Sequence, residues 1–334
     1  MKALVAVEIG KLALAELPVP VPGDYDALVR MEACAICNST DHKLLMNEFC
    51  PGPFPACLGH EVISTVVTVG PAVKNFRPGD RVFRQRLEDH HVPGGRSCWG
   101  GFAEFGLVTD HWAAKGVPYD LASLPHAQQK LILDVEPALA SAMVTLMETL
   151  DCARSAGAAP GVSFAVVGSG PVGQALAMFA KLLGASPVYA FGRRSEPARR
   201  FARVCRVDGY VVGTDFPREV ARILDRGGFD VVVEAVGSTE ALDTCLRLAG
   251  AKGRVGIYGV APESAPFRPD QKSKPNVSFV GGNEGRAQAR LVDFVQQGDV
   301  NLSDWVSHRF PLADFQKGFD LLAAKLATKV VLLP

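Results

Sequence analysis

The sequence predicts an α/β protein of two domains, and three observations support this. The chain has 334 residues, which is too long for one ordinary hydrophobic core. Residues 1 to about 110 form short β-rich runs broken by proline and glycine, whereas the later residues alternate strand-like and helical spacing. Hydrophobic residues make up 48% of the chain and charged residues 21%, as in globular proteins.

The N-terminal part is predicted to be an antiparallel, barrel-like domain. Its strand candidates read KALVAVEIG, DALVRMEA, EVISTVVTVG, DRVFRQ and GFAEFGLV. After about residue 285 the pattern gives two helices and two strands, the last of them TKVVLL. We expect this tail to return to the first domain, because the six strands of the other sheet come before it.

The middle of the chain is predicted to be a doubly wound parallel sheet, because six strand candidates alternate with helical segments. The strands read SFAVVGSG, PVYAFG, GYVVG, FDVVVEAVG, GRVGIYG and VSFVGG. The expected domains are therefore residues 1–140 with 286–334, and residues 141–285, with a cleft between them.

Charge and cysteine content argue against several classes of partner. Lys plus Arg and Asp plus Glu number 35 each, so the formal net charge is zero, which attracts neither nucleic acid nor an anionic membrane. Glu8 and Lys11 interrupt the N-terminal apolar run, which therefore does not fit a signal peptide. No apolar run reaches the ~18 residues of a membrane span. The 8 scattered cysteines indicate reduced thiols, so we expect a cytoplasmic protein with a small-molecule substrate.

VVGSGPVG supplies the pattern G-x-G-x-x-G directly after a predicted strand and at the start of a helix, as in dinucleotide-binding folds. Gly168 permits the tight turn, Gly170 lets the backbone approach a pyrophosphate, and Gly173 lets helix and strand pack closely. Pro171 and Val172 begin the helix, whose positive N-terminal end favours phosphate. The alternative is a glycine-rich turn that binds no ligand.

The end of the second parallel strand indicates which nucleotide is bound. An NAD-binding domain places an acid there for the ribose hydroxyls, about 20 residues past the motif. This sequence has Gly192, followed by Arg193 and Arg194. A glycine leaves space for a 2′-phosphate and a guanidinium can bind it with two charge-assisted bonds, so we expect NADP, with NAD as the alternative. The other interpretation is a solvated arginine pair ahead of a helix.

EACAICNSTDHKLL contains Cys34 and Cys37 in C-x-x-C spacing. A structural zinc site needs four ligands and the chain has no second such pair, while a redox dithiol belongs near a βαβ pattern. A third interpretation uses Cys37 alone, with His60 and Glu61 in CLGHEV and Glu136 in DVEPALA. Cysteine, histidine and carboxylate are the ligands of catalytic zinc, although spacing alone does not establish the site.

Motifs along the whole chain resemble the zinc-dependent alcohol dehydrogenases of the medium-chain dehydrogenase/reductase family, particularly the polyol and sorbitol dehydrogenase branch. They are CAICNSTDH, LGHEV, RPGDRV, GGFAEF, VEPALA, VGSGPVGQ, VVEAVGS, GRVGIYG and KVVL. The resemblance implies a split catalytic domain with a GroES-like β-barrel and a Rossmann domain. It also implies one catalytic zinc per chain in the cleft and a homodimer or homotetramer.

By this resemblance Cys37 and His60 correspond to the first two zinc ligands, and Glu61 to a carboxylate that enters or leaves the coordination shell. Glu136 stands where the family has cysteine, aspartate or glutamate, and in the polyol branch this glutamate can reach the metal through water. Cys34 matches no ligand position, and we expect it to be packed.

The resemblance assigns Ser39 the hydroxyl that takes the substrate proton, and His42 the histidine that passes it to solvent. The residues alone would favour a helix cap for Ser39 and a polar helix face for His42. Asp41 is expected to orient a neighbour or to cap the helix. Lys329 lies where some relatives have a basic residue near the pyrophosphate, and a solvated strand-end lysine is the alternative.

One segment departs from the family. Most relatives hold a structural zinc with four cysteines after GDRV, but FRQRLEDHHVPGGRSCWGGFAEF contains only Cys98. We therefore expect a short lobe without that zinc. His90 and His91 could join Cys98 in a metal site, but a solvent-facing loop is favoured, because no fourth ligand is evident.

The expected activity is a reversible, NADP-preferring alcohol dehydrogenase or carbonyl reductase. Its substrate would be a polyol, sugar, cyclitol or secondary alcohol. The alternatives are a zinc-free quinone or enoyl reductase of the same fold, and an NADPH-binding sensor without turnover.

Overall fold

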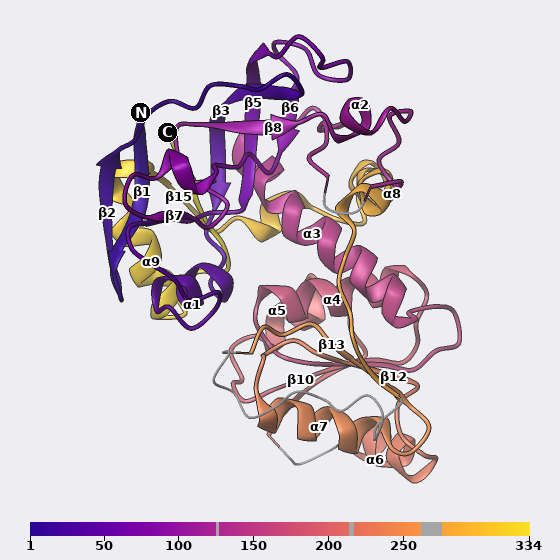
Figure 1. Cartoon of the computed structure of the whole chain (residues 1–334). Coiled ribbons are helices and arrows are strands. Elements are labelled where there is room, and N and C mark those ends of the chain that lie inside the picture. The colour runs from indigo at the N-terminus through magenta and orange to yellow at the C-terminus, as the bar shows by residue number, and fades with distance from the viewer. Residues whose placement is uncertain (125–126, 214–216, 262–275) are drawn as a thin grey trace. The chain divides into compact units, whose positions relative to one another are not determined.

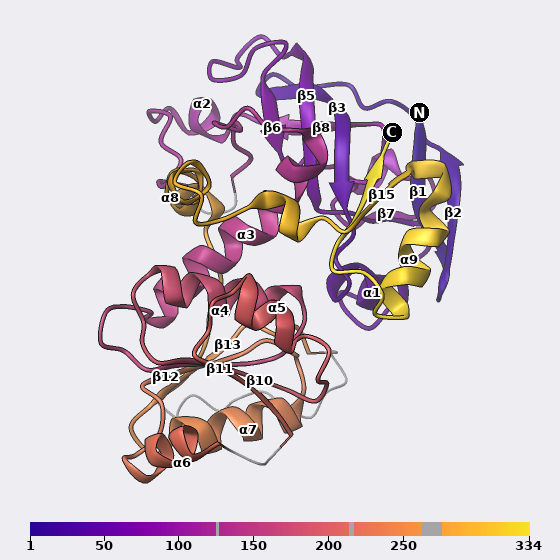
Figure 2. The same ribbon diagram turned by 180° about the vertical axis from the view of Figure 1, so that it is seen from behind.

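The computed structural model describes residues 1–124, 127–213, 217–261 and 276–334 (Figures 1 and 2). The chain divides into two compact units, one made of Met1–Thr145 with Glu284–Pro334 and the other of Leu146–Asn283. The long helix α3, Pro137–Ala156, begins in the first unit and ends in the second. None of the described helices is long and apolar enough to cross a membrane.

The first unit is built on two β-sheets. The larger has the strand order β15-β16-β3-β5-β6, with β8 also paired to β3. Its strands are β3 Asp26–Ala35, β5 Glu61–Val69, β6 Arg81–Phe83, β8 Phe105–Thr109, β15 His308–Pro311 and β16 Val330–Leu333. The smaller has the order β2-β1-β4-β7, formed by β1 Lys2–Glu8, β2 Lys11–Glu16, β4 Ala56–Cys57 and β7 Arg96–Ser97.

Short helices complete this unit. They are α1 Thr40–Leu45, α2 His111–Lys115, α8 Glu284–Gln296, α9 Phe315–Ala323 and the 3₁₀ turns η1 Asp89–His91, η2 Leu302–Trp305 and η3 Leu312–Asp314. Residues from α1, α9 and both sheets share one apolar core, in which Leu44, Leu322, Leu4 and Val62 are buried. Burial of this shared core holds the turn between β3 and α1 in place.

The C-terminal strand belongs to the first unit. β16 runs antiparallel to β3, with Leu332 opposite Cys34 and Val331 opposite Ala35. β3 also runs antiparallel to β5, where Ala35 lies opposite Glu61. These two registers bring three segments that are distant in sequence to one end of β3.

The second unit contains a six-stranded parallel sheet of order β11-β10-β9-β12-β13-β14. The strands are β9 Phe164–Val167, β10 Val188–Gly192, β11 Gly209–Val212, β12 Val231–Glu234, β13 Arg254–Ile257 and β14 Val277–Phe279. The order reverses between β9 and β12, which is where nucleotides bind in doubly wound sheets. The predicted fold class is thus confirmed.

Helices cover both faces of this sheet (Figures 1 and 2). α4 Pro171–Leu182 and α5 Ala198–Arg203 lie on one face, and α6 Arg218–Asp225 and α7 Thr239–Ala249 on the other. Every residue of β9 is buried, which explains its continuous apolar run, FAVV.

Candidate functional site

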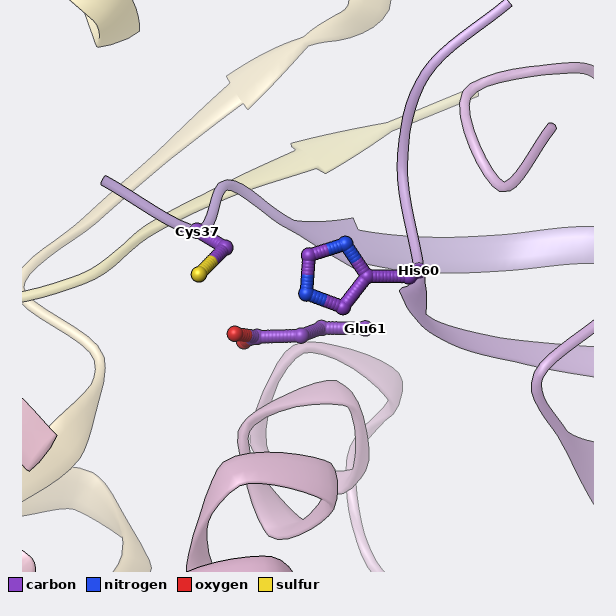
Figure 3. A group of neighbouring side chains, drawn as sticks. All are labelled: Cys37, His60 and Glu61. Atoms are coloured by element: carbon purple, nitrogen blue, oxygen red, sulfur yellow. The ribbon is translucent and has the colours of Figure 1, made fainter. Parts of the chain in front are cut away.

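Cys37, His60 and Glu61 form one group, in which the potential ligand atoms lie within 4.8 Å of one another. Figure 3 shows the sulfur, the imidazole and the carboxylate pointing toward a common space. Cys37 lies in the turn between β3 and α1, while His60 and Glu61 stand at the start of β5. The group exists because Ala35 and Glu61 are paired across β3 and β5.

Asp41 supports two members of this group from inside the protein. Its side chain is 0% exposed, and one carboxylate oxygen accepts the backbone N–H of Cys37 at 2.8 Å. The other oxygen lies 3.4 Å from Nδ1 of His60. A carboxylate behind Nδ1 orients the ring and leaves Nε2 as the free metal ligand.

The protonation of His60 is linked to metal binding. Burial alone would lower the pKa of His60, but the Asp41 carboxylate raises it well above its usual value. A metal ion must therefore displace a proton from this imidazole, which makes binding weaker as the pH falls.

Glu61 has a buried cationic partner. Lys329 Nζ donates to the Glu61 carboxylate, and also to Thr145 Oγ1 at 2.8 Å. Burial alone would raise the pKa of Glu61, but the Lys329 ammonium and His60 hold it below its ordinary value. Burial likewise opposes the charge on Lys329, and Glu61 raises the pKa of Lys329. The pair is therefore ionised.

This donor set fits zinc. A thiolate, an imidazole and a carboxylate are the ligands of catalytic zinc sites, which have three protein ligands and an open position. Among the described residues, Cys37, His60 and Glu61 are the His, Cys, Asp or Glu side chains that lie close enough together, as a group of three, to share one ion. Asp41 and Lys329 supply the outer contacts that fix ligand orientation in metal sites.

The structure does not bring Glu136 into the group. Its side chain is 51% exposed and binds Arg309 through both carboxylate oxygens, each at 3.1 Å. The guanidinium thus occupies the atoms that a metal would need. The expectation that Glu136 contributes to the zinc site is not supported by this arrangement.

Ser39 and His42 are exposed and lie on the turn that carries Cys37. Ser39 is the N-cap of α1, but its hydroxyl makes no capping bond. Instead Lys43 Nζ approaches the hydroxyl at 3.4 Å. The hydroxyl of Ser39 is therefore exposed on the turn and contacted by a side chain of α1.

The remaining cysteine and histidine candidates lie apart from the group. Cys34 is fully buried on β3, and burial raises the pKa of its thiol. The rings of His90 and His91 have centroids 3.9 Å apart and planes inclined by 44°, and His91 Nδ1 accepts the Glu88 backbone N–H at 2.9 Å. No group of three possible ligands includes His90, His91 or Cys98 among the described residues.

Among the predicted site residues, Lys329 has the environment that differs most from the predicted one. It is 6% exposed and bound to Glu61, so it is not a solvated strand-end lysine. Its position follows from β16, which begins one residue later beside β3. Its assignment to a nucleotide pyrophosphate finds no support in these contacts.

The glycine motif of the second unit has the predicted local geometry. Gly168 has φ 141°, and a Cβ on Gly173 would lie 2.1 Å from the Gly168 carbonyl oxygen. Gly170 caps α4, with Pro171 and Val172 in its first turn, and a Cβ there would meet nothing within 4 Å. The open space at a helix N-terminus fits a pyrophosphate.

Gly192 ends β10 beside this loop. A Cβ at this position would lie 2.2 Å from Tyr210 Oη and 2.9 Å from Ser169 Cβ. The Tyr210 hydroxyl donates to the Arg194 carbonyl at 2.6 Å, and its ring stacks on Phe201. An acid at position 192 would therefore collide with Tyr210, which the sequence pattern alone did not reveal.

Comparison with known proteins agrees with this geometry. Residues 23–119 match the alcohol dehydrogenase GroES-like domain, and residues 171–297 match the zinc-binding dehydrogenase domain. The L-threonine 3-dehydrogenase of Pyrococcus abyssi is 30% identical, with 96% of this chain and 94% of the relative covered. D-arabinitol dehydrogenase 1 of Uromyces fabae is 26% identical, with 100% and 97% covered.

Two solved structures share the fold over the whole chain. The alcohol dehydrogenase of Thermus sp. ATN1 has TM-score 0.79 and 25% identity, with 100% of both chains covered. A protein of Sinorhizobium meliloti 1021, described as a zinc-binding dehydrogenase and bound to NADP, has TM-score 0.76 and 27% identity, with 100% and 99% covered.

Fold, donor set and relatives together define a zinc-type dehydrogenase with a GroES-like domain and a nucleotide-binding domain. The chain belongs to the zinc-dependent alcohol dehydrogenases of the medium-chain dehydrogenase/reductase family, which are oxidoreductases.

Proposed function

We propose that the protein is an NADP-preferring alcohol dehydrogenase or carbonyl reductase with one catalytic zinc per chain. The observation that carries the proposal is the group of Cys37, His60 and Glu61 within 4.8 Å, backed by buried Asp41. A zinc-free quinone or enoyl reductase has no need of this donor set. A sensor without turnover has no need of an exposed hydroxyl on the turn that carries Cys37, where Ser39 lies.

The chain's own residues have separate roles in the proposed reaction. Bound zinc would supply Lewis acidity to the alcohol oxygen, and bound NADP would accept or return hydride. Asp41 fixes the His60 tautomer through Nδ1, and Lys329 keeps Glu61 ionised. Ser39 takes the substrate proton and His42 passes it to solvent, as histidine commonly does near neutral pH.

NADP is preferred because of position 192. Gly192 and Tyr210 leave no room for the ribose-binding acid that selects NAD. Arg193 is exposed and Arg194 partly exposed at the end of β10, where a guanidinium can bind the 2′-phosphate. The NADP bound by the Sinorhizobium meliloti relative supports this choice.

The proposed substrates are polyols, sugars, cyclitols and other secondary alcohols. The arabinitol dehydrogenase among the relatives supports a polyol. L-Threonine, the substrate named for several relatives, is also a secondary alcohol and therefore belongs in the same assay.

The protein is also proposed to assemble as a homodimer or homotetramer. Among the described strands, β14 is one of the two edge strands of the parallel sheet, and Phe279 on it is 64% exposed. An edge strand that carries an exposed, large apolar side chain favours pairing with a second copy.

The test is an assay of the zinc-loaded protein against acyclic polyols, cyclitols, secondary alcohols and L-threonine, with NADP and NAD compared. We expect turnover of at least one class, with higher kcat/KM for NADP. Nucleotide binding without turnover of any alcohol or ketone would support the sensor, and turnover of quinones by zinc-free protein would support the reductase.

A further inference from the structure

Trp99 is a bulky aromatic residue in a backbone conformation that such residues rarely adopt. Its φ is 71°, and the next residue, Gly100, has φ 82°. The left-handed region disfavours side chains with a Cβ, and strained residues of this kind cluster at functional sites. The strain raises the question of what the indole does there.

The backbone around Trp99 is fixed against the segment that leads to the metal group. Cys98 N donates to the Cys57 carbonyl and Gly101 N to the Gly59 carbonyl, each at 2.7 Å. A Cβ on Gly101 would lie 2.7 Å from the Gly59 oxygen, so the close approach requires glycine there. These bonds on both sides hold Trp99 in one place.

The indole lies beside a metal ligand and is open to solvent. The ring centroids of Trp99 and His60 are 5.1 Å apart, with the planes inclined by 51°. Trp99 is 42% exposed, whereas the other two tryptophans, Trp112 and Trp305, are 0% and 2% exposed. Burial in a core therefore does not explain Trp99.

We propose that Trp99 is a substrate-contact residue whose indole packs against the apolar face of a ring in the alcohol or ketone. This inference rests on the proposed function, because the metal group beside Trp99 fixes where the substrate oxygen binds. An aromatic surface is large and rigid, and it favours flat partners. Alcohols that contain a ring, both cyclitols and aryl carbinols, are thus selected over small acyclic alcohols.

The kinetic test compares Trp99→Phe, Trp99→Ala and Trp99→Gly, each checked for zinc content. Tyr25→Ala is the matched control, because Tyr25 is an aromatic residue of similar exposure, 41%, outside the group. For cyclohexanol and 1-phenylethanol, the Ala and Gly variants should lose roughly 3- to 10-fold in kcat/KM. The Phe variant and the control should lose little, and 2-butanol should be affected less than about 2-fold in every variant.

The glycine variant serves as the control for folding. Because glycine adopts positive φ without strain, the strain relieved in Trp99→Gly should offset part of the packing lost with the indole, and this variant should stay folded at the assay temperature. A loss of ring selectivity in this folded variant cannot come from unfolding. A folded Trp99→Gly variant that keeps the ring selectivity of the wild type would overturn the inference.

Fluorescence gives a readout independent of turnover. Without nucleotide, 1-phenylethanol should change the tryptophan emission of the zinc-loaded wild type but not that of Trp99→Phe, whose remaining tryptophans are buried. Equal kinetic losses on ring-bearing and acyclic substrates, or an emission change that survives in Trp99→Phe, would overturn the inference. If the wild type turned over no alcohol, the proposed function would fail, while an emission change lost in Trp99→Phe would still support ring contact at Trp99.

Discussion

Lys329 and Glu61 form a buried ion pair across 268 positions of sequence, in which the ammonium of Lys329 donates to the carboxylate of Glu61. Their side chains are 7% and 4% exposed. Glu61 also belongs to the group of possible metal ligands, so the pair ties the C-terminal strand to the metal group.

Replacing Lys329 by Met should destabilise the zinc-free protein by about 3 kcal/mol, because it leaves a buried carboxylate unpaired. The double variant with Glu61→Gln should be more stable than Lys329→Met alone. Urea unfolding measures the free energy of unfolding of both variants. The control is Lys317→Met, whose partner Asp314 is exposed, and it should cost less than about 1 kcal/mol. Equal costs at the two lysines would show that Glu61 does not depend on Lys329.

Asp41→Asn should weaken zinc binding about 10- to 100-fold, because His60 loses the carboxylate that orients it. Competition with a chromophoric chelator measures the affinity. Asp24→Asn changes an exposed aspartate and should leave the affinity unchanged. Wild-type affinity in Asp41→Asn would mean that the 3.4 Å contact with His60 has no role.

Exchanging Arg193 and Arg194 for Ala should raise the KM for NADPH far more than the KM for NADH, because only NADPH has the 2′-phosphate. Steady-state kinetics with both nucleotides measure the effect. Similar increases for the two nucleotides would count against the assignment of NADP.

Gly192→Asp should weaken the binding of both nucleotides, since a Cβ at this position would meet Tyr210 Oη at 2.2 Å. Adding Tyr210→Ala makes room for the acid and should restore NADH binding but not NADPH binding. Equilibrium titration of both nucleotides tests this. Unchanged NADPH affinity in the single variant would contradict the assigned position of Tyr210.

Asp110 should contribute stability that disappears in acid. Burial alone would raise its pKa, but hydrogen bonds from the Asn75 side chain and from the backbone N–H of Ala113, Lys74 and Asn75 hold the pKa below its ordinary value. The stabilisation is therefore present above the unfolded-state pKa of about 3.9 and is lost as the pH falls through the lower folded-state pKa.

Asp110→Asn should accordingly be about 1–3 kcal/mol less stable than the wild type at pH 7, and the difference should shrink in strong acid. Urea midpoints across this range measure it. A difference that does not depend on pH would show that the charge of Asp110 contributes nothing.

The sequence predicts most of the fold and the centre of the site. The family resemblance of their motifs assigns Cys37, His60 and Glu61 to the metal. The three side chains lie close together because the end of β3 and the start of β5 are paired. The glycine motif is found because its spacing is local. Such features depend on short stretches of chain that fold in a standard way.

Other features depend on pairings that no local pattern specifies. Lys329 reaches Glu61 only through the register of β16 on β3. The family resemblance places Glu136 near the metal, directly or through water, but the Glu136 carboxylate accepts from Arg309, 173 positions away. Trp99 gains its place beside His60 from loop hydrogen bonds that follow no sequence motif.

Zinc per chain after exhaustive dialysis, measured by elemental mass spectrometry in the wild type and in Cys37→Ala, tests the central claim most directly. We predict about one zinc per wild-type chain, and loss of that zinc together with alcohol turnover in the variant. A Cys37→Ala protein that keeps its zinc and its turnover, or a wild type without zinc that remains active with NADPH, would contradict the account.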